Sequence, residues 1–319
     1  MDPGVRATAA LRASGAGWTE DGKIVGMRAV VDTSALESFI DAAGEASTGE
    51  VEPVTAWAGY EHRHADLFAR YFDRWGDVQR RPAAAAAMVQ TAERLAASGL
   101  DWHGLLDDVA ARMTALVPED LEVPVVVFVG TGTSNGWVTP LGGRSTVFLA
   151  AELAAPPPFE AVLTAHELTH AAQYLLNPAW EAADYPVGAN AFAEGLATFV
   201  SSLAYPGLGD DEYLWFDSAH QQWLRDCEQA WPTAAASLAQ VLDEPCGGAA
   251  ERRFFSSPPA GEKATVPRRF GYYAGWRIVR DLAAEMTAAD LLTLDIPTTQ
   301  RLVRDRLDDG HRSAAQPAR

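Results

Sequence analysis

The chain has 319 residues, of which 43 are acidic and 25 are basic, so its formal net charge is −18. Nucleic acids and anionic membrane surfaces attract clustered Lys and Arg side chains, so this charge argues against both as partners. Hydrophobic residues make up 48% of the chain, which predicts a folded protein with a large core rather than a disordered one. The length allows one or two domains.

Two further features bear on the cellular compartment. The sequence has two cysteines, Cys227 and Cys246, too few for a disulfide framework or a four-thiolate metal site. The first twenty residues lack the apolar core of a secretory signal, and no apolar run is long enough to span a membrane. We therefore expect a cytoplasmic protein, and its oligomeric state stays open.

The first 120 residues have the pattern of a mainly helical section. An apolar, β-branched stretch near the start predicts a strand over Lys23–Asp32. Amphipathic spacing, with capping and stop residues at the ends, then predicts helices at Ala35–Ala46, His64–Trp75, Pro82–Ala97 and Trp102–Leu116.

The pattern changes to strands near residue 121. Val123–Val129 and Ser145–Leu149 are short apolar runs between turn signals, and we expect them to belong to an antiparallel sheet. The glycine-rich segment Gly130–Gly136 superficially suggests a phosphate-binding loop. It lacks the Lys-Ser/Thr ending of such loops and leads into no helix, so we expect a hairpin loop there.

Helices dominate the remainder of the chain. A run of three prolines opens a helix at Phe159, and Asn177-Pro178 ends it after Leu176. Further helices are expected at Gly188–Leu203, Glu212–Ala230, Thr233–Leu242, Tyr272–Glu285 and Thr298–Leu307, with a long loop over Cys246–Phe270 and a disordered tail over residues 310–319. The predicted class is α+β, mainly helical with a small mixed or antiparallel sheet.

The segment His166–His170, with the sequence HELTH, contains the candidate metal-binding and catalytic residues. Residues four apart share one face of a helix, so His166 and His170 can grip one Zn²⁺ ion, and Glu167 can act as general base on a water at the metal. A catalytic zinc site needs a third protein ligand. The longer HExxHxxGxxH motif does not supply it, because Gln173 and Leu176 stand where its glycine and third histidine would fall.

A downstream carboxylate is the remaining source of the third ligand. Glu194 lies on the next predicted helix, which can fold back onto the first through a turn that contains two prolines. Glu181 and Asp184 compete for the role, but both fall in the predicted connection rather than on a packed face.

HELTH followed by a helix with the sequence EGLA resembles the gluzincin clan of zinc metallopeptidases, whose third ligand is a Glu on the helix after HExxH. The segment Arg269–Trp276 is similar to a Tyr-Tyr-x-Gly signature in a bacterial family of predicted, largely uncharacterised zinc-dependent proteases. The resemblance covers about residues 120–285. It implies a zincin-like catalytic region over residues 121–309, which follows the helical section 1–120 along the chain.

The same resemblance implies that one zinc ion is held by His166, His170 and Glu194. One position departs from the thermolysin-like branch, which places an Asp four residues after the ligand Glu to orient a histidine, whereas this chain has Thr198. Thr198 and Asn190, one turn either side of Glu194, are the candidates for that orienting role.

The predicted reaction also needs a donor for the oxyanion that forms on the attacked carbonyl. Tyr272 and Tyr273 are the candidate catalytic residues for this role, and the sequence does not choose between them. His220, Arg268 and Arg269 are further candidates, and either arginine could instead bind a substrate carboxylate.

The expected function is therefore that of a zinc metallopeptidase, a hydrolase that acts on a peptide or protein substrate. The strand at Ser145–Leu149 could be the sheet edge on which an extended peptide adds as one more strand. A zinc-dependent amidase that acts on a small molecule would share every motif. A non-catalytic zinc-binding protein with a regulatory role is the other alternative, although the intact Glu167 favours catalysis.

Overall fold

The structure, a computed structural model, describes residues 26–181, 185–256 and 266–314, and the side chains of the last range up to residue 308. Its sheet has four strands in the order β1-β2-β4-β3. They are β1 (Met27–Asp32), β2 (Leu121–Phe128), β3 (Gly136–Leu141) and β4 (Arg144–Ala150). β1 and β4 both run parallel to β2, whereas β3 is antiparallel to β4, so the sheet is mixed. The first residues of the predicted strand from Lys23 lie outside the described residues.

The expectation that the two central strands are antiparallel is wrong. They form β2 and β4 and pair in parallel, with Val125 opposite Val147 and Phe128 opposite Ala150. Both strands are buried on both faces along most of their length. Continuous apolar strands that are covered on both faces are typical of parallel sheets, so the β-branched run of β2 suits its observed neighbours.

The segment Gly130–Gly136 is not a hairpin loop, contrary to the prediction. It joins β2 to β3, but β3 pairs with β4 on the far side of the sheet. The hairpin lies between β3 and β4, where Gly142 and Gly143 adopt φ values of 60° and 81° that favour glycine. Consequently β3 is an edge strand and β4, predicted as the edge, is interior.

The helices between β1 and β2 are α2 (Ser34–Ser47), α3 (Pro53–Arg63), α4 (Ala65–Arg74), α5 (Arg81–Ala86), α6 (Met88–Ser98) and α7 (Trp102–Met113). An aromatic cluster joins this section to the sheet. The ring of Tyr60 packs against Phe39 and Phe68, and Phe68 packs in turn against Tyr71. The Tyr60 hydroxyl donates to the carbonyl of Val129 and accepts from its N–H. Because β1 belongs to the same sheet as β2, the helical front section shares one core with the rest of the chain.

The helices after the sheet are α8 (Phe159–Leu176), α9 (Val187–Ala204), α10 (Asp210–Trp215), α11 (Gln221–Ala239), α12 (Ala249–Phe255), α13 (Phe270–Leu282), α14 (Ala288–Leu292) and α15 (Ile296–Ala314). The bounds of α8 match the prediction. The helix predicted over Glu212–Ala230 is two helices, because Phe216 and Ala219 between them take positive φ. In contrast, α11 continues through Pro232, where a break was predicted.

Two predicted irregular segments are partly helical. α12 lies within the loop predicted over Cys246–Phe270, of which residues 257–265 lie outside the described residues. α15 continues past residue 310, where the disordered tail was predicted to begin, and residues 315–319 lie outside the described residues.

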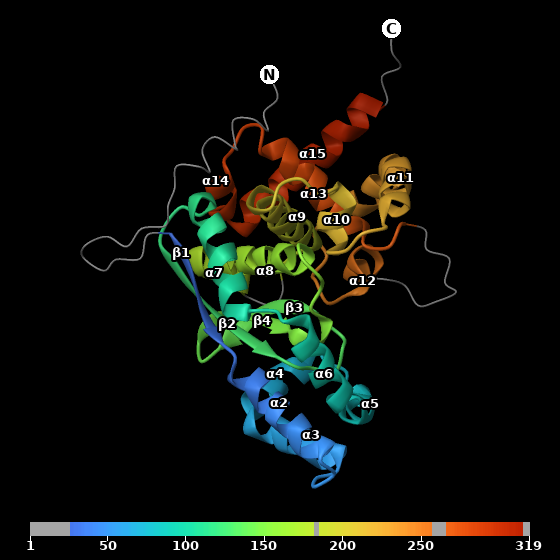
Figure 1. Ribbon diagram of the computed structural model, residues 1–319. Helices are drawn as coiled ribbons and strands as arrows, with labels where there is room; N and C mark the ends of the chain where they lie inside the picture. Colours follow the sequence, from blue (N-terminus) through green and yellow to red (C-terminus); the bar gives the residue numbers. More distant parts are fainter. Residues whose placement is uncertain (1–25, 182–184, 257–265, 315–319) are drawn as a thin grey trace, which may run out of the picture.

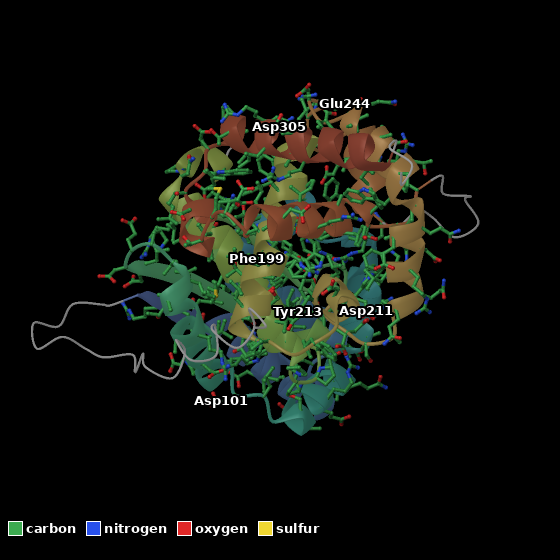
Figure 2. All side chains as sticks on the ribbon, turned by 90° about the horizontal axis from the view of Figure 1, so that it is seen from above. Asp101, Phe199, Asp211, Tyr213, Glu244 and Asp305 are labelled. Atoms are coloured by element: carbon green, nitrogen blue, oxygen red, sulfur yellow. The ribbon has the colours of Figure 1, made fainter. Side chains whose placement is uncertain are left out.

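The elements form layers around the sheet. Helices α2 to α6 lie on one face, α7 and α8 cover the other, and α9, α13 and α15 lie beyond α8 (Figure 1). Trp276 of α13 contacts Phe199 of α9 and Tyr213 of α10, which are labelled in the view from above in Figure 2, with 6.3 Å between ring centroids in each pair. None of the described helices combines the length and apolar character needed to cross a bilayer.

Helices α9 and α13 approach each other through two glycines. A Cβ atom on Gly195 would overlap the backbone of Gly275, and a Cβ on Gly275 would overlap the carbonyl oxygen of Ala191. Gly195 follows Glu194 in the EGLA segment, and Gly275 ends the Tyr-Tyr-x-Gly segment. The EGLA segment and the Tyr-Tyr-x-Gly segment are therefore in contact, and their glycines allow the backbones of α9 and α13 to approach closely.

Replacing Gly275 by Ala is expected to destabilise the fold by about 3 kcal/mol, because the added methyl group meets backbone atoms that cannot move independently. Thermal unfolding followed by circular dichroism should show a melting temperature lower by roughly 4–6 °C. The control is Gly44→Ala in α2, where a Cβ has no neighbour within 4 Å and the helix should gain up to about 1 kcal/mol. Equal melting temperatures for both variants would contradict the close contact.

Candidate metal centre

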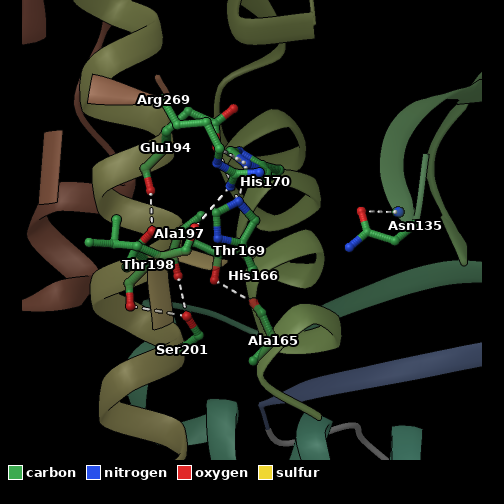
Figure 3. Close-up of polar contacts among 12 residues, drawn as sticks. Asn135, Ala165, His166, Thr169, His170, Glu194, Ala197, Thr198, Ser201 and Arg269 are labelled. Atoms are coloured by element: carbon green, nitrogen blue, oxygen red, sulfur yellow. Dashed lines mark hydrogen bonds and ion pairs between the residues drawn. The ribbon is translucent and has the colours of Figure 1, made fainter. Parts of the chain in front are cut away.

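Helices α8 and α9 position the three predicted ligands. Residues 160–173 of α8 are all buried, so the face with His166 and His170 lies inside the protein with 3% and 8% of each residue exposed. Glu194 reaches the same point from α9 (Figure 3). The predicted return of the second helix onto the first therefore does bring the carboxylate to the histidine pair.

The three donor atoms lie at distances that fit one metal ion. The two imidazole Nε2 atoms are 3.1 Å apart, and Glu194 Oε2 lies 3.1 Å from His166 Nε2 and 3.6 Å from His170 Nε2. A tetrahedral ion with bonds of about 2.0–2.1 Å holds its donors ~3.3 Å apart. The nitrogen and oxygen donors are also those that Zn²⁺ accepts, so these residues fit the implied ion in both geometry and chemistry.

The pKa shifts of His166 and Glu194 suit metal binding, whereas the pKa of His170 is raised. Burial lowers the pKa of His166 to about 4, so its imidazole is neutral and basic at pH 7. Burial disfavours the charged form of Glu194, but hydrogen bonds from the two histidines outweigh it and hold the pKa of this carboxyl well below its usual range. Burial also lowers the pKa of His170, but the hydrogen bond with Glu194 outweighs this effect and raises the pKa overall.

Glu167 faces the cavity beside the ligands rather than the ligand cluster itself. Its side chain packs against the backbone of Gly136, where a Cβ would come within 2.8 Å of Glu167 Cγ. Burial raises the pKa of Glu167 to about 7. A carboxylate with a pKa near neutral pH is a stronger proton acceptor than an exposed one, as a general base requires.

A cavity of about 490 Å³ opens beside this cluster. Its walls come from residues 133–136 before and at the start of β3, from α8 and α9, and from the α12 and α13 region. Figure 3 shows Asn135 across the cavity from Glu194, with the histidines between them. The volume lies within the range of small-molecule sites, so the cavity is large enough for a small ligand beside the three donor residues.

The structure separates the two candidate tyrosines. Tyr272 lines the cavity, and burial raises the pKa of its hydroxyl, which therefore stays protonated as a donor. Tyr273 is not among the cavity residues and packs against Trp223, Trp231 and Phe270, with ring centroids 5.9–6.4 Å apart. Tyr272 therefore lies in the cavity and Tyr273 outside it, because successive residues on a helix face different directions.

Of the other candidates for the oxyanion donor, one lines the cavity and two do not. Arg269 lines the cavity, but Arg268 does not and is exposed. His220 lies outside the cavity, where its ring stacks on Trp215 and pairs with Asp217.

The candidates for orienting the histidines have different positions. Thr198 donates its hydroxyl hydrogen to the carbonyl of Glu194 in its own helix, so it does not orient a histidine. Asn190 lines the cavity. Within the described residues, the buried Nδ1 atoms of His166 and His170 have no hydrogen-bond partner.

Of the competing carboxylates, Glu181 accepts a hydrogen bond from Ser145 and lies outside the ligand cluster. Asp184 lies outside the described residues.

Several cavity residues did not emerge from the sequence. Asn135 and Gly136 lie in the segment that was predicted to be a hairpin loop, and Arg74 comes from the helical front section. Tyr174 could have been found, because it follows His170 by four residues and so shares its helix face; the two rings are 6.3 Å apart.

Comparison with protein-family models, with curated proteins and with solved structures finds no match for this chain. The identification of a candidate metal centre accordingly depends on its donor atoms, their spacing and the cavity beside them.

Proposed function

We propose that the chain is a zinc-dependent metallopeptidase of the gluzincin type. His166, His170 and Glu194 would hold one zinc ion, and Glu167 would be the general base. The observation that carries this proposal is the convergence of the three donor atoms within 4.8 Å of one another at the wall of a cavity that also contains Glu167. A structural zinc site is closed by four protein ligands, whereas three ligands beside a cavity leave a position for water.

When bound, zinc supplies Lewis-acid polarisation of a carbonyl and lowers the pKa of a water molecule. Side chains of the protein would transfer the proton and stabilise the oxyanion. Glu167 accepts the proton of the attacking water and delivers it to the leaving amine. The Tyr272 hydroxyl, which lines the same cavity, donates to the oxygen that becomes negatively charged.

The edge strand favours a peptide over a small amide as substrate. Gly136, Trp137 and Val138 of β3 line the cavity next to Glu167. One side of β3 pairs with β4, and within the described residues no strand pairs with its other side. An extended peptide can add there as a further strand and place a carbonyl next to the metal ligands. The role expected of Ser145–Leu149 thus passes to β3.

Replacing Tyr272 by Phe is expected to lower kcat by about a hundredfold with little change in KM, because the hydroxyl acts only on the transition state. The matched control is Tyr273→Phe, which removes the same hydroxyl from a neighbouring residue outside the cavity and should change kcat by less than about threefold. Steady-state kinetics on one peptide substrate measures both. A larger loss in Tyr273→Phe would reverse the assignment.

Both cysteines are free, Cys227 in the core and Cys246 partly buried. Thiols that stay reduced are typical of proteins from a reducing compartment, so we propose a cytoplasmic location.

The proposed function is tested with the full chain loaded with one equivalent of zinc and incubated with a mixture of synthetic peptides. Mass spectrometry should show cleavage that a chelator stops and added zinc restores. Intact peptides together with hydrolysis of small amides would favour the amidase alternative. Zinc binding without either reaction would favour a regulatory zinc protein.

A further inference from the structure

Arg269 has an unusual backbone conformation at the start of α13. Its φ of 56° lies in the left-handed region, which a residue with a long side chain rarely adopts. Hydrogen bonds on both sides fix this conformation: its N–H donates to the carbonyl of Ser256, and its carbonyl accepts from the N–H of Tyr272. Strained residues of this kind cluster at ligand-binding and active sites, so the position warrants a search for a ligand.

The side chain of Arg269 is held in place. Its guanidinium carbon lies 4.2 Å from the ring centroid of Tyr272 and 4.8 Å from that of Trp215, and one terminal nitrogen donates to the carbonyl of Leu214 at 2.9 Å. Contacts with two aromatic rings restrict the guanidinium plane, which lowers the entropy lost when it binds a partner. The group is therefore pre-organised.

This guanidinium has no anionic partner within the described part of the chain. No carboxylate there lies within ion-pair distance of Arg269, and its buried Nε has no hydrogen-bond partner. Glu251, another carboxylate among the cavity residues, accepts a hydrogen bond from the backbone N–H of Gly247. A buried donor without a partner costs free energy unless a ligand satisfies it.

The position of Arg269 points to the substrate as that ligand. The residue lines the same cavity as Glu167, and it lies near Glu194 and the two histidines in Figure 3. A planar guanidinium binds a carboxylate with two parallel hydrogen bonds, which a neutral amide cannot match. A carboxylate on Arg269 and a carbonyl at the metal ligands must then belong to the same short substrate, because they share a cavity of about 490 Å³.

We infer that Arg269 anchors a carboxylate of the substrate, so that the site acts on amide bonds close to a free C-terminal carboxylate and removes short pieces from the ends of peptides. This inference rests on the proposed metallopeptidase function and deepens it by naming the substrate class. Arg269 is a binding residue in this scheme, and Tyr272 remains the donor to the oxyanion. An acidic side chain next to the scissile bond would offer Arg269 the same carboxylate chemistry. The experiment below distinguishes such a side chain from a C-terminal carboxylate.

Binding is measured by calorimetry with the full-length, zinc-loaded Glu167→Gln protein, in which turnover is prevented. The probes are benzyloxycarbonyl-Ala-Phe with a free carboxylate, the same compound with a C-terminal amide, and benzyloxycarbonyl-Ala-Glu with a C-terminal amide. We expect the free acid to bind at least about tenfold more tightly than either amide, as a charge-assisted pair should provide. Adding Arg269→Met should reduce this ratio to less than about threefold.

Arg268→Met is the matched control, because Arg268 also contacts the Trp215 ring but is exposed and lies outside the cavity. It should keep the full preference for the free acid. Arg269→Lys is the second variant if Arg269→Met does not fold. It keeps the charge but loses the planar fork, so it should show an intermediate preference.

If the Glu167→Gln protein bound the free acid and its amide equally tightly, the proposed role of Arg269 would be overturned, whether or not the wild-type chain hydrolyses peptides. A preference that survives Arg269→Met, or tighter binding of the glutamyl amide than of the free acid, would overturn it as well. Failure of the peptidase proposal looks different: the Glu167→Gln protein would prefer the free acid and lose that preference with Arg269→Met, while the wild-type chain would hydrolyse none of the three probes.

Discussion

Replacing Glu194 by Ala is expected to lower the affinity for zinc by at least about a hundredfold and to leave the purified chain largely free of metal. Glu194 supplies the only carboxylate among the three converging donors, and without it two imidazoles remain for an ion that prefers four ligands. Metal content per chain after dialysis, measured by mass spectrometry of the elements, and competition with a zinc indicator both test this expectation.

Glu181→Ala is the matched control for this experiment. Glu181 was a competing candidate for the third ligand, but its carboxylate accepts a hydrogen bond from Ser145 and lies outside the donor cluster. This variant should keep one zinc ion per chain. If instead Glu194→Ala keeps full occupancy, the third ligand lies elsewhere and Asp184 becomes the carboxylate to replace next.

The convergence of the three donor residues could be predicted because it depends largely on local geometry. His166 and His170 are one helical turn apart, and proline and asparagine signals set both ends of the helix that carries them, so α8 was predicted over its observed bounds. Glu194 needed one further step, the return of the next helix. A connection of ten residues between α8 and α9 leaves that helix little freedom to lie elsewhere.

The sheet and the cavity wall depend on contacts between distant residues and could not be predicted in the same way. Nothing in the sequence near Gly136 shows that β3 pairs with the far side of β4 and so becomes the edge strand next to Glu167. The same holds for the position of Arg269, which depends on its left-handed backbone conformation before α13 and on the ring of Trp215. Patterns of hydrophobicity indicate that a strand exists, but they do not determine which strand it pairs with.

Replacing Glu167 by Gln is expected to lower kcat by about a thousandfold and to leave zinc binding intact. Gln keeps the shape that packs against the Gly136 backbone, but its amide cannot accept the proton of the attacking water. Glu167 is not one of the three converging donors, so the metal content should stay at one ion per chain. Peptide turnover and elemental analysis on the same preparation separate the two effects.

The same helix offers a matched control. Glu160 is also a buried glutamate of α8, and burial raises its pKa to about 7 as well, but it accepts a hydrogen bond from the N–H of Ala155 and lies outside the cavity. If loss of a buried carboxylate from α8 were enough to impair the enzyme, Glu160→Gln would be as inactive as Glu167→Gln. We expect Glu160→Gln to retain turnover within about threefold, because Glu160 lies outside the cavity that Glu167 shares with the three donor residues. Wild-type activity in Glu167→Gln would rule out this residue as the base.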